Sequence, residues 1–245
     1  MRVKIGRVLS LCLFLSLGST AAKADVVVPN YAAGSEATGA FFLFSTLAAG
    51  RTYQMTIAAN QLTNIVGQQI TGMQIRLNGG FANNWPPEDV GFDFFNVVIG
   101  PGVAPSAMSN TFADNFTGVG STVRTGPLTI AAGSFLTGPG PNDFGPAITF
   151  DSGYLYNGGD LAIEFRFGPQ ISGTIVNPSF DAVPTAGDGW GSDFAARWTG
   201  NAAGTSGANG NFIVSNLIAI PEPTSGTLLL FAMAGMLLRR RSVGR

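Results

Sequence analysis

The side chains that could carry chemistry in this chain are carboxylates. The 245-residue chain has no histidine, and residues 25–220 contain no lysine and no cysteine. Ser-His-Asp and Cys-His arrangements, Ser-Lys dyads, Schiff bases and the usual zinc sites are therefore excluded. A glycosidase needs two acids about 5–10 Å apart across a sugar-binding cleft. The acidic candidates are Asp143, Asp151, Asp160, Glu164, Asp181, Asp188 and Asp193. No pair is distinguished by its spacing, and aspartates beside glycine or asparagine usually form turns, so we do not expect an enzyme.

Two tryptophans and a group of aspartates suggest binding instead. Trp190 and Trp198 could stack on sugar rings, or they could anchor a loop or the core. Asp181, Asp188 and Asp193 lie in a polar, glycine-containing stretch, and carboxylate and carbonyl oxygens are the ligands that calcium prefers. The turn at residues 157–160 is equally rich in oxygen. Turn formation explains both stretches as well as calcium does, so we expect no cofactor, with calcium as a minor alternative.

Two further segments have open interpretations. The stiff loop that begins Trp85-Pro-Pro could contact a glycan or a protein, or it could pack its tryptophan on the rim of the fold. Glu164 and Arg166 are two positions apart in a predicted strand, so they share one face. We expect that face to be solvated, with these charges paired across to a neighbouring strand.

The elements that must position these residues are short strands. Apolar and polar residues alternate with period 2, most clearly at residues 161–167, and Gly, Pro and Asn turns separate the strands. The expected strands are 52–57, 73–77, 95–99, 122–124, 128–130, 147–150, 161–167, 174–176, 195–198 and 212–218. Residues 60–66 could form a helical turn, and 199–210 should be a loop. This pattern predicts an all-β antiparallel β-sandwich, jelly-roll-like, whose core would be filled largely by phenylalanine, of which the whole chain has 19.

The N-terminal residues have the pattern of a secretory signal peptide. Basic Arg2, Lys4 and Arg7 precede an apolar core at 8–17, and Ala22-Lys23-Ala24 is a small-x-small cleavage site. We expect export through the Sec translocon and a mature chain that begins at Asp25. The only cysteine, Cys12, lies inside this segment. The mature fold would therefore contain no disulfide, which fits a bacterial envelope protein.

Charge is divided unevenly along the chain. Residues 25–220 contain five Arg against thirteen Asp and Glu, a net charge of −8, whereas the whole chain carries −1. Phosphate binding depends on positive charge, so the acidic body disfavours nucleic acid and anionic lipid as partners. It is compatible with solubility outside the cell.

The C-terminal residues combine three features in a fixed order. Pro221-Glu222-Pro223 is followed by an apolar run at 228–238 and then by Arg239, Arg240 and Arg241. Thr224 and Ser225 could cap a transmembrane helix over 224–238, about 22 Å long. The three arginines predict a cytoplasmic C-terminus.

This tail resembles the PEP-CTERM sorting signals of Gram-negative bacteria. The body is more loosely similar to one kind of PEP-CTERM ectodomain at residues 94–99, 108–115, 126–130 and 154–161, a likeness that implies no activity. The resemblance implies that an exosortase cleaves the chain near Pro221-Glu222-Pro223, with Glu222 as the recognised group. The expected organisation is a signal peptide at 1–24, a β-sandwich ectodomain at 25–218, and a sorting signal with a transmembrane helix and basic tail at 219–245.

Together these observations predict an exported structural or adhesive protein. It would be an inner-membrane-anchored precursor that is then released to the cell surface or the extracellular space, in contact with exopolysaccharide in a biofilm. A carbohydrate-binding module is the first alternative, and a carboxylate-dependent glycoside-acting enzyme is the second.

Overall fold

The computed structural model describes residues 25–44, 48–174 and 176–221. This part of the chain is all-β, with five short 3₁₀ turns and no α-helix. The strands are β1 (Val26–Val28), β2 (Gly39–Phe41), β3 (Arg51–Ile57), β4 (Gln68–Ile75), β5 (Val90–Phe92), β6 (Phe95–Pro101), β7 (Ser121–Arg124), β8 (Leu128–Ile130), β9 (Ile148–Tyr156), β10 (Leu161–Phe167), β11 (Gln170–Ser172), β12 (Phe180–Val183), β13 (Phe194–Thr199), β14 (Ala208–Asn209), β15 (Phe212–Ile213) and β16 (Ser215–Pro221). The 3₁₀ turns are η1 (Asn30–Ala33), η2 (Ala59–Gln61), η3 (Thr63–Ile65), η4 (Pro105–Ala107) and η5 (Phe112–Asn115).

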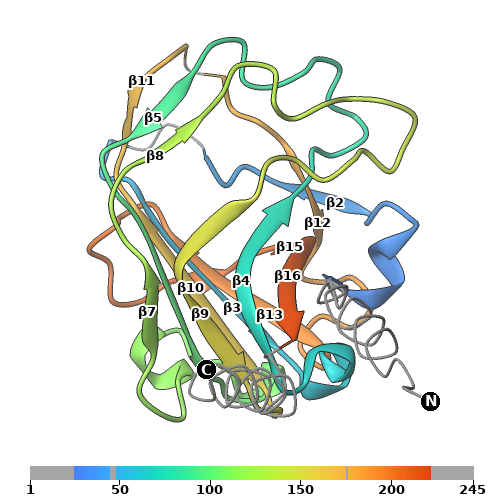
Figure 1. The fold of residues 1–245 in the computed structure, drawn as a ribbon, viewed down its shortest axis with the longest axis vertical. Helices are drawn as coiled ribbons and strands as arrows, with labels where there is room; N and C mark the ends of the chain where they lie inside the picture. The colour runs from blue at the N-terminus through green and yellow to red at the C-terminus, as the bar shows by residue number, and fades with distance from the viewer. Residues whose placement is uncertain (1–24, 45–47, 175, 222–245) are drawn as a thin grey trace, which may run out of the picture. The chain divides into compact units, whose positions relative to one another are not determined.

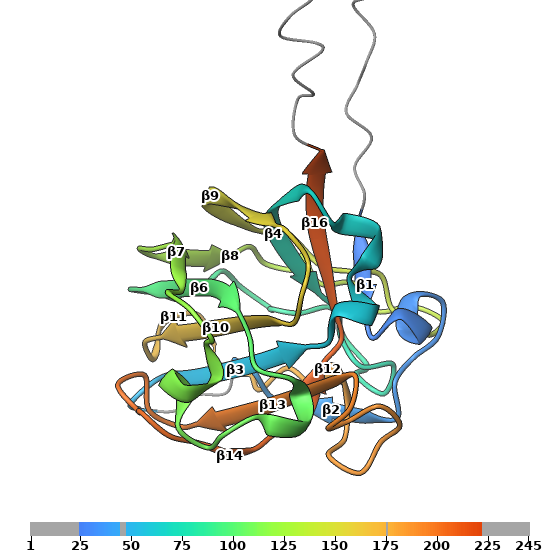
Figure 2. The ribbon, with the colours of Figure 1, turned by 90° about the horizontal axis from the view of Figure 1, so that it is seen from below.

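The strands form two main sheets and two smaller ones. A four-stranded sheet has the order β1-β16-β4-β9, and a six-stranded sheet has the order β14-β13-β3-β10-β6-β7. Two three-stranded sheets, β11-β5-β8 and β15-β12-β2, complete the fold. All pairings between these strands are antiparallel. Figure 2 shows the four-stranded sheet as a layer beside the six-stranded one, and in Figure 1 β5, β8 and β11 lie together at one end of the body.

Alternate residues of both main sheets enter one core. Ile163 and Phe165 of β10 are fully or almost fully buried, as are Tyr53 of β3, Ile70 of β4 and Leu217 of β16. Because successive side chains of a strand point to opposite faces, the period-2 pattern of the sequence becomes the inner surface of each sheet.

Phe44 is the centre of an aromatic cluster in this core. Its ring centroid lies 5.3 to 6.1 Å from those of Phe180, Phe92, Phe167, Trp85 and Phe95. These partners come from β12, β5, β10, β6 and the loop before β5. Tilted and edge-on contacts at this spacing add to the free energy of apolar burial, so one side chain joins four sheet strands and a loop.

About half of the expected strands lie close to their predicted bounds, and several others were displaced or missed. β10 has the predicted bounds, and β3, β6, β7, β8 and β13 lie within one or two residues of theirs. β4 begins and ends earlier than the expected 73–77, and β9 continues well beyond the expected end at 150. η2 and η3 provide the helical turn at 60–66. Thr174 and Val176 lie outside strands, whereas β14 lies within the predicted loop at 199–210. β1, β2, β5, β11 and β12 were missed, because three or four residues are too few to establish a period.

The last strand extends beyond the predicted end of the domain. β16 pairs with β4 as far as Pro221, which lies opposite Gln68, so residues 219–221 belong to the sheet. The expectation that the sheet ends at 218–220 is therefore wrong by one to three residues. Proline is tolerated here because β1 covers β16 only as far as Leu217, so the missing N–H removes no bond to a described strand on that side.

The aromatic cluster predicts a large difference between two neighbouring phenylalanines. Replacing buried Phe44 by alanine should lower the free energy of unfolding by about 3–5 kcal/mol, because it leaves a cavity among several rings. Phe42, which is 51% exposed, is the matched control, and its replacement by alanine should have little effect. Urea unfolding of residues 25–221 measures both; equal losses would show that the cluster does not have this central role.

Candidate functional site

The two ends of the described body lie beside each other. Val26 pairs with Leu217 and Val28 with Ser215, so the start of β1 and the end of β16 are at the same end of the four-stranded sheet (Figure 2). Gln68 at the start of β4 lies opposite both Pro221 and Tyr156, the last residue of β9. We call this end of the sheet the exit pole. Both segments with membrane-related sequence features join the body there.

Most of the predicted sorting residues lie outside the described part of the chain. These are Ala22 and Ala24 of the signal cleavage site, Glu222 and Pro223, the helix expected at 224–238, and Arg239, Arg240 and Arg241. Pro221 is described and is partly buried at the end of β16. Within residues 25–44, 48–174 and 176–221, no helix has the length and apolar character needed to cross a membrane.

The two candidate sugar-binding tryptophans pack against the core. The guanidinium of Arg51 lies over the Trp198 ring, 4.7 Å from its centroid, and Arg197 lies 5.7 Å from that of Trp190. Trp190 Nε1 donates a hydrogen bond to the carbonyl of Gly210 at 3.1 Å. An arginine therefore lies over an aromatic face of each tryptophan, and an aromatic face is what a sugar ring would stack on. The geometry favours the interpretation of both tryptophans as anchors.

Trp85 is also a core residue. Its side chain is 1% exposed, its ring stacks on that of Phe44, and its Nε1 donates to the carbonyl of Val176 at 3.2 Å. The expectation of a contact loop or a rim position for this tryptophan is wrong. Its neighbours Pro86 and Phe135 extend the same buried region, so the loop is fixed from below and exposes Pro87, Glu88 and Asp89.

The three calcium candidates are placed in different surroundings. Asp181 is fully buried on β12, Asp188 is exposed, and Asp193 accepts a hydrogen bond from Asn60 Nδ2 at 2.9 Å. Asp160, in the other oxygen-rich turn, accepts from the backbone N–H of Ala59. The part of the chain that the structure describes contains no group of three or more His, Cys, Asp or Glu side chains arranged to hold a metal ion.

Asp181 forms a buried ion pair with Arg76. Arg76 Nε donates to Asp181 Oδ2 at 2.8 Å, and both side chains are at most 2% exposed. The backbone N–H of Ala37 donates to Asp181 Oδ1, and Arg76 also donates to the carbonyls of Ala32 and Ser35. Burial raises the pKa of the Asp181 carboxyl, and Arg76 opposes that rise. The pair fastens the N-terminal segment to β12 and to the end of β4.

The outer face of the six-stranded sheet carries a second buried polar group, which corrects the expectation of a solvated face. Glu164 is 6% exposed and pairs with Arg166 on its own strand, at 2.6 Å between Oε1 and Nε. Gln54 Nε2 donates to Glu164 Oε2 at 3.0 Å and to the carbonyl of Phe112 at 2.9 Å. Asn115 Nδ2 donates to Gln54 Oε1 at 2.7 Å.

Two loops cover this polar group. The segment around η4 and η5 meets the loop after β13, where Phe112 N–H donates to the Thr205 carbonyl. Arg166 reaches the same loop by donating to the carbonyls of Ala202 and Gly204. Both oxygens of Glu164 have a hydrogen-bond donor, so this carboxylate is engaged in holding loops over the sheet. We assign it a structural role.

All five arginines of the body are inside or half-inside the fold. Each of them is buried or half-buried: Arg51, Arg76, Arg124, Arg166 and Arg197. Eight carboxylates are exposed: Asp25, Glu88, Asp89, Asp93, Asp114, Asp143, Asp151 and Asp188. Each arginine donates to backbone carbonyls, and burial lowers the pKa of Arg51 to about 10. The described surface is therefore more acidic than the net charge indicates.

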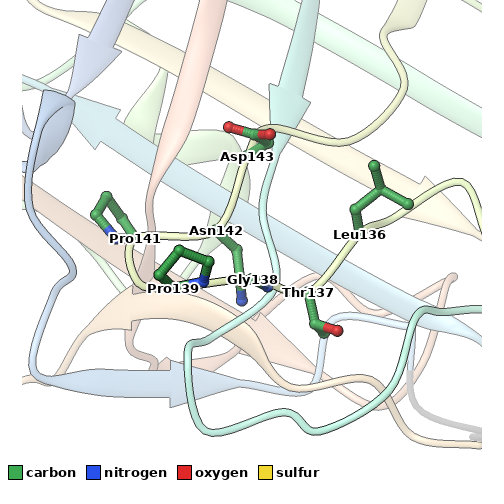
Figure 3. Close-up of a pocket in the computed structure, with 7 residues that line it drawn as sticks. All are labelled: Leu136, Thr137, Gly138, Pro139, Pro141, Asn142 and Asp143. Atoms are coloured by element: carbon green, nitrogen blue, oxygen red, sulfur yellow. Dashed lines mark hydrogen bonds between the residues drawn. The ribbon is translucent and has the colours of Figure 1, made fainter.

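A shallow depression of about 210 Å³ lies in the loop before β9 (Figure 3). It is lined by Leu136, Thr137, Gly138, Pro139, Pro141, Asn142 and Asp143. Asn142 holds the loop in shape, because its side chain accepts from Gly138 N–H and donates to the Leu77 carbonyl. Asp143 is the only carboxylate in this lining. The two-acid chemistry of a glycosidase has no second partner within it.

Several important residues were not found from the sequence. The Arg76–Asp181 pair joins positions 105 residues apart, and no local pattern reveals such a contact. The Gln54–Asn115 contact also depends on loop placement. One signal was available: with five arginines and no lysine between residues 25 and 220, each cation is of the type suited to bidentate, interior contacts with carbonyls and carboxylates.

Replacing Asp181 can distinguish a structural role in the ion pair from a role in calcium binding. Asp181→Asn should lower the free energy of unfolding by about 3–5 kcal/mol, since it leaves the Arg76 charge buried without a counter-charge. Asp188→Asn, at an exposed position, should have little effect. Urea unfolding with and without calcium measures both variants. If calcium stabilised the parent protein and neither variant, the three-aspartate calcium site would be favoured instead.

Comparison of the chain with protein-family models, with curated proteins and with solved structures finds no match.

Proposed function

We propose that this protein is an exported, non-catalytic surface protein that is membrane-anchored as a precursor. Its C-terminal segment would then be cleaved near Pro221-Glu222-Pro223 by an exosortase. The observation that carries the proposal is the ordered tail: the proline-flanked glutamate, the apolar run at 228–238, and Arg239, Arg240 and Arg241. The mature body would be a structural or adhesive component of an extracellular polysaccharide layer.

The exit pole supports this proposal by geometry. Before its signal peptide is cleaved, such a precursor is tethered to one membrane at both ends, and a body whose two ends lie close together suits that state. The β1–β16 pairing places residues 26 and 217 opposite each other, and β16 continues only to Pro221. The folded body therefore reaches the first residue of the proposed motif.

The rest of the body supports a passive role. Its most buried carboxylates, Glu164 and Asp181, are bonded to arginines, and the depression beside Asp143 offers one acid. An acidic surface would repel anionic polymers. We therefore propose a matrix partner that is an uncharged polysaccharide, or an acidic one bridged by divalent cations.

We infer a jelly-roll-like sandwich, since two antiparallel sheets share one core, together with one transmembrane helix at 224–238. The large apolar area that the phenylalanines bury lets such a domain be stable in the envelope without disulfides.

Glutamate recognition predicts a processing defect. In the native host, Glu222→Ala should leave full-length protein in the inner-membrane fraction, because the recognised group is lost. Glu88→Ala is the matched control, since Glu88 also follows proline and is exposed. Intact mass by fraction measures the outcome; normal release of the Glu222 variant would refute the sorting role.

The basic tail predicts a topology defect. Replacing Arg239, Arg240 and Arg241 together by glutamine should let the tail slip through the membrane, because the positive charge that holds it on the cytoplasmic side is removed. Protease protection of a C-terminal epitope in spheroplasts measures this. An epitope that stays protected in the variant would argue against a stop function.

A further inference from the structure

We propose that the exit pole carries an apolar rim, formed by Val66, Leu155 and Ile220, that contacts the lipid surface while the protein is membrane-anchored. This inference depends on the proposed function only through the C-terminal anchor. It adds a contact of the folded body with the bilayer, so that the body is held in one orientation.

The sheet register brings the rim together. Ile220 of β16 and Leu155 of β9 both lie opposite Gln69 of β4, so they occupy one row across three neighbouring strands. Their chain neighbours Ala219 and Tyr156 are buried in the core. Because side chains alternate between the faces of a strand, Ile220 and Leu155 point outward.

Val66 lies at the same end of the sheet, in the turn between η3 and β4. The next residue, Gly67, donates its N–H to the carbonyl of Tyr156, and the turn after β9 approaches Val66 at Gly158. Val66 is 51% exposed, and Leu155 and Ile220 are each 37% exposed. Three large apolar side chains are thus uncovered at the end of the sheet from which the chain leaves.

The short length of chain after Pro221 indicates that the surface in contact with the rim is the bilayer. Six residues separate Pro221 from the apolar run that begins at Leu228, and seven extended steps span at most about 25 Å. If the helix begins near Thr224, as its sequence predicts, only about 10 Å remains. The interfacial zone of a bilayer is about 5–8 Å thick on each side. A tether of this length is short enough for the rim to reach the headgroup layer.

Charge shows which kind of lipid surface fits. All five body arginines are engaged within the fold, whereas Asp25 is exposed next to β1 and Asp160 and Asp193 lie partly exposed at the same end of the body. The contact is therefore apolar and opposed by anionic headgroups. It should be closest on zwitterionic lipid, and on anionic lipid it should strengthen as salt screens the repulsion.

Single-cysteine labelling of the full chain tests the contact. In a Cys12→Ser background, Leu155→Cys and Ile171→Cys each provide one site for an environment-sensitive fluorophore. Ile171 is the matched control, because it is 62% exposed on β11 at the other end of the body (Figure 1). The protein is reconstituted into zwitterionic vesicles that contain spin-labelled headgroup lipid, and quenching is compared with that in unlabelled vesicles.

We expect several-fold stronger quenching at position 155 than at position 171. Equal quenching in vesicles that carry the protein through flotation would overturn the rim contact and leave the anchor intact. Failure to float would refute the anchor itself, and the inference with it. A label at 155 that becomes shielded with rising protein concentration in detergent would show instead that the rim is an interface between two copies.

A second variant separates a contact from mere proximity. With the label at Val66→Cys, the added change Leu155→Glu should reduce quenching, because a charge in the rim opposes lipid contact. Leu155→Gln, which is polar and uncharged, should give an intermediate value. If quenching at position 66 is the same in both Leu155 variants as without them, the tether alone places the body near the lipid.

Discussion

The structure depends on apolar burial, since the chain has a single cysteine, Cys12, and no disulfide can form within it. The cluster around Phe44 meets this constraint by joining side chains of β5, β6, β10 and β12. It ties both three-stranded sheets to the six-stranded one through a loop residue. Each ring buries a large apolar area and restricts its neighbours, so the positions of the surrounding loops follow from how these rings pack.

The arginines hold strands and loops together at the edges of the aromatic core. Arg76 joins the end of β4 to β12, and Arg166 joins β10 to the loop that covers it. A buried ion pair adds little net stability compared with an apolar pair, but removing one partner is costly. Such contacts therefore specify one arrangement of the loops. Because the arginines are engaged inside the fold, the exposed charges are mostly carboxylates. The placement of the arginines therefore both orders the interior and leaves the surface acidic.

The sequence predicts the all-β class and the strands β3 and β10, because apolar and polar residues alternate along the sequence of each. It fails where three-dimensional contacts decide the outcome. Glu164 and Arg166 look like an exposed face, yet η5 and the loop after β13 bury them. Trp85 looks like a surface loop residue, yet it stacks on Phe44. In each case the covering segment is distant in sequence, and no local period reveals it. The proposed sorting motif, by contrast, is inferred from the order of its residues in the chain and not from any three-dimensional contact.

The position of the proposed motif at the end of β16 determines whether cleavage would disturb the folded body. β16 lies between β1 and β4, and its Leu217 and Ala219 are fully buried in the core. A cut before Ile220 would remove part of a central strand and expose the facing residues of β4. A cut after Pro221 would leave every described pairing of β16 in place. Release of the body can therefore follow folding without any cost in stability only if the bond that is broken lies on the C-terminal side of Pro221, which is where the proposed recognition residue, Glu222, lies.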